Sequence, residues 1–433
     1  MRTHEETIDF AKQALESRKA DKNASVFGVK GPSLLSKIVP DIIKCTAIDI
    51  MHGVFLGVFK MLLNLWLSPS FSGMPWSVSH LFAVLDEKLC KIKSPSFAER
   101  SPRTLKQFML YYSVPLLKNV LEEAYLKHHC LLVAAISLLS QDSISLGQIQ
   151  TASALLASYV SEFARLYPLR YLGLNVHQLV HLADVTLELG PCWVYSCFFL
   201  ENFNGVINKM FHGTQHVALQ ICSSVAMMMK IPEFKSILPP ESKVKEFCLR
   251  LEQGSKQLKI ADVIDVNTNA VGKYCYEREK LCNSAQVVRR VCRKVSGTCC
   301  VFYRIQKRGV VYFAEEYPRQ SSRKESSFIT FRENETIKVG RILRFVRWSN
   351  CRDLCDTDCR NCPADYVAII RIFERKHWFI HDMRDIRIPH ISHVQQTDII
   401  TVVGVESILG LCFHFEADNL QYVAAPVNRL ERE

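Results

Sequence analysis

The sequence predicts an α+β protein, in which an all-helical N-terminal half is followed by a small β-rich, barrel-like domain. Up to about residue 235 the apolar residues recur with helical spacing, as they do over residues 149–163. From about residue 299 the pattern changes to short runs of Val, Ile, Phe and Tyr between polar loops, as in residues 366–373. We therefore expect a helical domain over 1–235, a polar linker region over 236–298 and a β-rich domain over 299–433.

The composition fits a globular chain with a basic surface. Of the 433 residues, 48% are hydrophobic, which is enough to fill more than one core. The formal net charge is +11. An excess of this size indicates either a polyanionic partner such as DNA or an ordinary basic surface.

The 17 cysteines and the apolar stretches bear on the compartment. The N-terminus is charged and does not resemble a signal peptide, and the apolar stretches at residues 54–67 and 130–139 are too short or too interrupted to span a membrane. We therefore expect an intracellular protein with no membrane partner. Its cysteines should be reduced, serving as buried small hydrophobes or as metal ligands.

Two acidic positions in the helical half are candidates for chemistry. Asp49 opens a helical stretch, where it either caps free backbone N–H groups or pairs with His52 on the same face. Glu201 directly follows an apolar run, where burial would raise its pKa unless a cation balanced its charge. Glu201 therefore either binds a metal ion or faces solvent at the edge of an amphipathic helix.

Histidines and cysteines occur at two spacings that suit metal ligands. His177 and His181 lie four residues apart, so on a helix both would project from one face toward one ion. Further along, four cysteines fall close together, and thiolates prefer zinc. These are Cys351, Cys355, Cys359 and Cys362. The alternative is that these residues have no ligand.

A basic run without acidic residues lies between residues 286 and 308. Its cationic members are Arg289, Arg290, Arg293, Lys294, Arg304, Lys307 and Arg308. The run either neutralises phosphates while Phe302 and Tyr303 stack on bases, or forms a solvated face. Nuclear-import signals have a similar composition. Motifs for nucleotide hydrolysis and serine hydrolases are absent from the sequence, and we expect no small-molecule substrate.

The order of these motifs resembles that of CACTA-type (En/Spm-like) DNA transposases. Residues 26–33 and 48–58 are similar to the family's G-[IV]-K-G-x-S … D-x-M-H-x-x-x-L-G-V passage, and residues 105–112 are similar to its segment ending F-L-L-Y-Y. Residues 175–182 resemble its N-x-H-x-L-x-H-L block, and residues 196–202 resemble its S-x-F-x-F-E-N block. The resemblance covers roughly residues 1–235, with a weaker likeness to animal members at the C-terminal end.

The resemblance implies a role for each motif. Enzymes of this family use an RNase H-like domain whose D, D and E carboxylates hold two Mg²⁺ or Mn²⁺ ions for DNA cut-and-paste transposition. Glu201 would be the last of these carboxylates, on a helix that follows an all-helical insertion domain. His177 and His181 would be the pair that related families complete with an upstream C-x-x-C to bind zinc. Asp49 and His52 would form the family's D-x-x-H signature.

The sequence departs from the family pattern at its N-terminal end. About 25 residues precede the first matching passage, and they contain no C-x-x-C. Asp9 and Asp21 lie in a polar helical region rather than at the end of a strand. We therefore expect the RNase H-like sheet to be largely missing, and Mg²⁺ or Mn²⁺ to bind only if the missing carboxylates are supplied. Glu201 should have no second carboxylate within about 6 Å, the range of strong coupling between charges.

Three functional hypotheses follow. The first is a transposase-derived, catalytically incomplete nuclear protein that binds DNA or related transposase subunits. The second is the C-terminal piece of a longer, active DDE transposase. The third is an intracellular interaction protein without a nucleic-acid role, stabilised by zinc at the four clustered cysteines.

Overall fold

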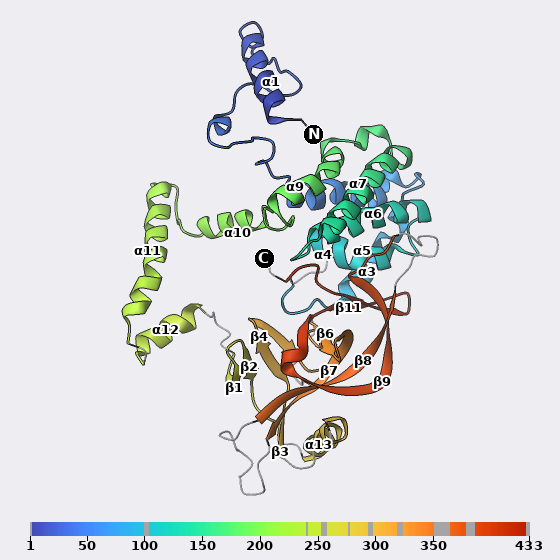
Figure 1. Ribbon diagram of the computed structural model, residues 1–433, viewed down its shortest axis with the longest axis vertical. Helices are drawn as coiled ribbons and strands as arrows, with labels where there is room; N and C mark the ends of the chain where they lie inside the picture. The colour runs from blue at the N-terminus through green and yellow to red at the C-terminus, as the bar shows by residue number, and fades with distance from the viewer. Residues whose placement is uncertain are drawn as a thin grey trace.

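The computed structural model shows helices followed by antiparallel sheets, which confirms the α+β class (Figure 1). It describes residues 2–98, 104–239, 241–252, 258–275, 278–292, 298–317, 324–349, 364–377 and 386–429. Among these residues no strand precedes Ile260.

The helical half alternates long helices with short turns of helix. Its elements are α1 (His4–Ser17), η1 (Leu34–Lys37), η2 (Met51–Phe59), α2 (Lys60–Leu67), η3 (Pro69–Phe71), η4 (Ser79–Leu81), α3 (Phe82–Lys91), α4 (Leu105–Gln107), η5 (Phe108–Tyr112), α5 (Ser113–Leu117), α6 (Glu123–Leu139), α7 (Leu146–Leu166), η6 (Leu169–Tyr171), α8 (Leu174–Gln178), η7 (Leu179–His181), α9 (Leu182–Leu189), α10 (Phe198–Ile207), α11 (Val217–Ile237) and α12 (Lys243–Glu252). Both η2 and η5 are π-helical, a winding that is rare and often found at functional sites.

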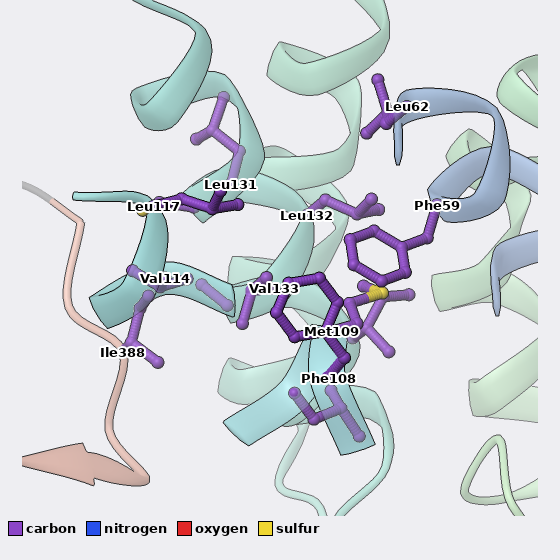
Figure 2. Close-up of a cluster of buried hydrophobic side chains, with 14 of the residues drawn as sticks. Phe59, Leu62, Phe108, Met109, Val114, Leu117, Leu131, Leu132, Val133 and Ile388 are labelled. Carbon is purple, nitrogen blue, oxygen red and sulfur yellow. The ribbon is translucent and has the colours of Figure 1, made fainter. Parts of the chain in front are cut away.

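Helix α6 lies at the centre of the helical core. It is apolar on nearly every side, as expected of a helix enclosed by other elements. Side chains from η2, η5 and α6 interlock in this core, where Phe59 and Phe108 lie beside Val133 (Figure 2). The two histidines of α6, His128 and His129, are completely buried within it.

Helices α10, α11 and α12 lead away from the helical body (Figure 1). No residue of α10 or α11 is buried. By length and composition α11 could cross a membrane, although it contains Pro232. The expectation that every apolar stretch is too short therefore overlooked residues 217–237. Helix α11 is the one helix in the described part of the chain that meets both conditions.

The C-terminal part consists of two antiparallel sheets. The strands are β1 (Ile260–Asp265), β2 (Thr268–Val271), β3 (Thr298–Phe302), β4 (Arg304–Lys307), β5 (Val310–Phe313), β6 (Phe328–Glu333), β7 (Thr336–Ser349), β8 (Ala364–His377), β9 (Ile391–Gly404), β10 (Ile408–Leu411), β11 (Phe413–Ala417) and β12 (Leu420–Ala424). One sheet has the order β1-β2-β4-β5; the other runs β10-β6-β7-β8-β9-β12-β11, with β3 also paired to β7. No pairing between the end strands β10 and β11 closes the larger sheet in the described residues, so the expected barrel is not confirmed.

Local sequence accounts for two of the hairpins. The β6–β7 turn places Asn334 and Glu335 at positive φ, and the β11–β12 turn does the same with Asp418 and Asn419. Two consecutive residues at positive φ make the turn whose twist matches that of the adjoining strands. The register then follows directly, with Glu333 opposite Thr336.

Two observations differ from the predicted division into three regions. The region expected to be a polar linker contains α12, β1, β2 and α13 (Arg278–Cys292), and β2 pairs with β4. The helical core around α6 also includes side chains from the β-rich half of the chain. Phe413 of β11 stacks on Tyr111 of η5 at 4.0 Å between ring centroids, and Ile388 packs in the same cluster (Figure 2). The sheets and helices are therefore joined by shared apolar packing.

Candidate functional site

Asp49 lies two residues before the start of the π-helix η2 and binds its first turn. The Asp49 carboxylate accepts hydrogen bonds from the backbone N–H groups of Met51 and His52, each at 3.1 Å. This is the capping role expected for an acid at this position. The expected pairing with His52 is also present, because His52 Nδ1 lies 2.5 Å from Asp49 Oδ2.

The same carboxylate connects η2 to a segment far along the chain. Asp49 Oδ1 accepts a hydrogen bond of 2.9 Å from the backbone N–H of Cys197, just before α10. Burial opposes the ionisation of Asp49, but the N–H groups of Cys197 and His52 outweigh it and hold the pKa below its ordinary value. Asp49 is therefore a charged, fixed group at the junction of two helices.

Glu201 lies in the first turn of α10, close to His52. Its carboxylate oxygen Oε1 is 3.3 Å from His52 Nε2, and its side chain is 57% exposed. The preceding apolar residues are also exposed, since Phe199 and Leu200 retain 71% and 57% of their accessible surface. The apolar run that precedes Glu201 therefore does not bury its side chain. Its position at the solvent edge of α10 agrees with the alternative.

Cys197 forms a cluster with Asp49 and His52, and it was not among the candidate residues predicted from the sequence. A carboxylate oxygen of Asp49, a ring nitrogen of His52 and Sγ of Cys197 all lie within 4.8 Å of one another. Partial burial, a thiol hydrogen bond to Asp49 and the charges of Asp49 and Glu201 together raise the pKa of the thiol. Without a cation nearby Cys197 is thus a protonated thiol and a poor nucleophile.

Four of the sequence blocks that carry the resemblance to transposases meet around this cluster. Asp49 contacts Cys197, and His52 contacts Glu201. In addition, Asn175 of α8 packs against Gly57 of η2. A Cβ atom at Gly57 would lie 2.6 Å from Asn175 Nδ2. Lys106 Nζ lies over the ring of Phe198, 5.1 Å from its centroid. Residues distant in sequence thus form one local arrangement.

His177 and His181 lie side by side but form a less complete arrangement. Their ring centroids are 5.3 Å apart, and His177 is exposed while His181 is partly buried. Burial and the neighbouring His177 lower the pKa of His181. In the described residues the pair does not belong to any group of three metal-ligand side chains, and the only such group is the one at Asp49. The zinc role of the pair stays a prediction.

The predicted basic run is divided between different environments. Arg289 and Arg290 are exposed near the end of α13, whereas Arg293 and Lys294 lie outside the described residues. Phe302 and Tyr303 are buried, with 1% and 9% exposure. The expectation that these two rings stack on bases is therefore wrong.

Two cations of the run, Lys307 and Arg304, contact groups within the protein. Lys307 Nζ donates to the backbone carbonyls of Val405, Glu406 and Ile408 at 2.8–2.9 Å. The guanidinium of Arg304 lies over the ring of Tyr317, at 4.9 Å. Arg308 occupies the β4–β5 turn at positive φ.

The four clustered cysteines, Cys351, Cys355, Cys359 and Cys362, lie outside the described residues. Zinc binding there stays a prediction. In comparisons with known proteins, no protein-family model and no curated sequence matches this chain.

Proposed function

We propose that this chain is a transposase-derived protein that has kept the glutamate end of the ancestral site and acts by binding DNA or related transposase subunits. The observation that carries the proposal is the meeting of the motif blocks around Asp49. Asp49 and Cys197 are 148 positions apart, yet they share a hydrogen bond, and Glu201 reaches His52 one helical turn later. Blocks that were matched only by their order in the sequence are therefore neighbours in space.

The chemistry of the cluster supports binding rather than DNA cleavage by this chain alone. Two-metal strand transfer needs several carboxylates around a pair of hard cations. The three-donor group in the described residues instead combines one carboxylate with an imidazole and a thiol. Glu201 contacts the imidazole, so Asp49 and Glu201 lie on opposite sides of His52 rather than facing one another.

The DNA-binding part is tested by fluorescence anisotropy of the purified full chain with labelled duplex DNA over a salt series. We expect affinity to fall linearly with the logarithm of salt concentration, because phosphate contacts release counterions. The double variant Arg289→Glu, Arg290→Glu should weaken binding and reduce the salt slope by about 2. Arg332→Glu, at an exposed position on β6, is the matched control. Absence of any salt-dependent affinity would refute this part.

A second candidate function rests on the surface around Glu201. Phe199, Leu200 and Phe203 on the same helix are all substantially exposed, and clustered exposed apolar side chains mark protein interaction sites. In this candidate the chain completes an active transposase with a partner that supplies the missing aspartates. The experiment mixes it with a chain carrying the two aspartates of a CACTA-type catalytic domain and measures Mn²⁺-dependent cleavage of transposon-end DNA. Cleavage that requires Glu201, and is lost in Glu201→Gln, would favour this candidate; a mixture without cleavage would reject it.

A further inference from the structure

The cluster beside η2 brings together three different kinds of donor atom. The carboxylate oxygen of Asp49, the ring nitrogen of His52 and Sγ of Cys197 lie within 4.8 Å of one another. Ligand atoms around one tetrahedral zinc ion lie about 3.5 Å apart, so small side-chain rotations would bring the set to bonding distance. The His52 side chain is 56% exposed, which leaves the cluster open to an ion from solvent.

The contacts of the His52 ring give a second, independent indication. His52 Nδ1 lies 2.5 Å from Asp49 Oδ2, and His52 Nε2 lies 3.3 Å from Glu201 Oε1. A carboxylate therefore faces each nitrogen of the ring. This is the arrangement in which one ring nitrogen binds an ion and the other donates its proton to a carboxylate.

We propose that Asp49, His52 Nδ1 and Cys197 bind one divalent ion of borderline softness, such as Zn²⁺, and that Glu201 is a positioning residue. Oxygen, nitrogen and sulfur donors together suit Zn²⁺ or Co²⁺, whereas Mg²⁺ requires oxygen ligands. A carboxylate that accepts the second N–H of a ligating histidine fixes the ring and raises its basicity. The contacts within the cluster support this metal site whether or not the chain binds DNA or transposase subunits.

Binding of the ion changes the protonation of the Cys197 thiol. The Cys197 thiol loses its proton to solvent, and the thiolate sulfur forms a bond to the ion, so binding of one ion releases one thiol proton. The carboxylates of Asp49 and Glu201, which disfavour a thiolate when no cation is present, then lie beside a positive charge. No change of oxidation state is involved.

The test is a Co²⁺ titration of the full chain, followed by the thiolate-to-cobalt absorption band in the near ultraviolet. Because other cysteines can contribute absorption, the measured quantity is the difference between paired proteins. Cys197→Ser keeps the backbone N–H that binds Asp49 and should lose one equivalent of bound Co²⁺ together with part of the band. Cys45→Ser is the matched control, since Cys45 is exposed and is no part of the cluster. It should titrate like the unmodified chain.

The same Co²⁺ titration tests the role of Glu201 with a separate variant. Glu201→Gln should keep the thiolate band but bind Co²⁺ about tenfold more weakly, as expected when a carboxylate behind a ligating histidine is removed. Excess Mg²⁺ should leave the band unchanged. The proposal is overturned if Cys197→Ser retains the full band and stoichiometry, or if the unmodified chain shows no thiolate band.

Discussion

Burial of His129 in the centre of α6 leads to a quantitative prediction about acid stability. The ring stacks on Phe59 and lies edge-on to Trp66, and its Nε2 is 2.8 Å from the Ser113 hydroxyl. Burial lowers the pKa of His129 from 6.5 to about 3, and the nearby His128 contributes. The folded protein therefore holds this ring neutral at pH values where the unfolded chain is protonated.

The sign and size of the effect follow from proton linkage. Between pH 6.5 and about 3 the unfolded state binds the additional proton, so stability falls as pH falls through this window. A pH of 5 lies about 1.5 units below the pKa of a histidine in the unfolded chain. His129 alone should therefore lower the free energy of unfolding by about 2 kcal/mol relative to neutral pH. This is a large share of the stability of an ordinary domain.

The perturbation is His129→Phe, which keeps a planar ring between Phe59 and Trp66 but cannot bind a proton. The Ser113 hydroxyl keeps its bond to the carbonyl of Met109. Urea unfolding is measured at pH 7.5 and pH 5.0, and the quantity compared is the loss of unfolding free energy between the two. We expect this loss to be about 2 kcal/mol smaller in the variant. His80→Gln, at an exposed position, should lose as much as the unmodified chain. Equal losses in His129→Phe and the unmodified chain would refute the reasoning.

Three further outcomes are expected. Gly57→Ala should destabilise the protein by about 1–3 kcal/mol in urea unfolding, because its Cβ would lie 2.6 Å from the backbone carbonyl oxygen of residue 52. Gly147→Ala should not, because its Cβ would meet only Ser145 Oγ, at an ordinary contact distance of 4.0 Å; equal effects would argue against the close packing on η2. Lys307→Met should lower stability by about 1–3 kcal/mol, since three carbonyls lose a charged donor. It should scarcely change the salt slope of DNA binding, and a large change in slope would assign Lys307 to the DNA surface. Cys355→Ser with Cys359→Ser should reduce zinc content measured by mass spectrometry; unchanged zinc would eliminate a site there.

The sequence predicted the class of fold well because periodicity reports burial directly. Helix α7 and strand β8 both lie where apolar spacing placed a helix or a strand. The start of the β-rich part was predicted too late, at residue 299. Strand β1 begins at Ile260 and carries mostly exposed and half-exposed side chains, so it lacks the continuous apolar run that identified the later strands.

The candidate site was predicted only in part, because two of its contacts depend on tertiary structure. The Asp49–His52 pair is local and follows from helical spacing. The contact with Cys197 depends on how α10 meets η2, and no local pattern encodes it. The burial of Phe302 was missed for a similar reason. A single aromatic residue in a strand can face either side of the sheet, and here it stacks on Phe345 in the core.

The packing of Phe413 on Tyr111 has a consequence for how the chain folds during synthesis. The Tyr111 hydroxyl also accepts a hydrogen bond from the backbone N–H of Val427, so residues about 300 positions later in the chain cover part of the helical core. At the usual rate of translation, the roughly 300 residues between Tyr111 and Phe413 take about 15 to 60 s to emerge. During that interval the face of Tyr111 that Phe413 covers in the folded protein is still without this partner.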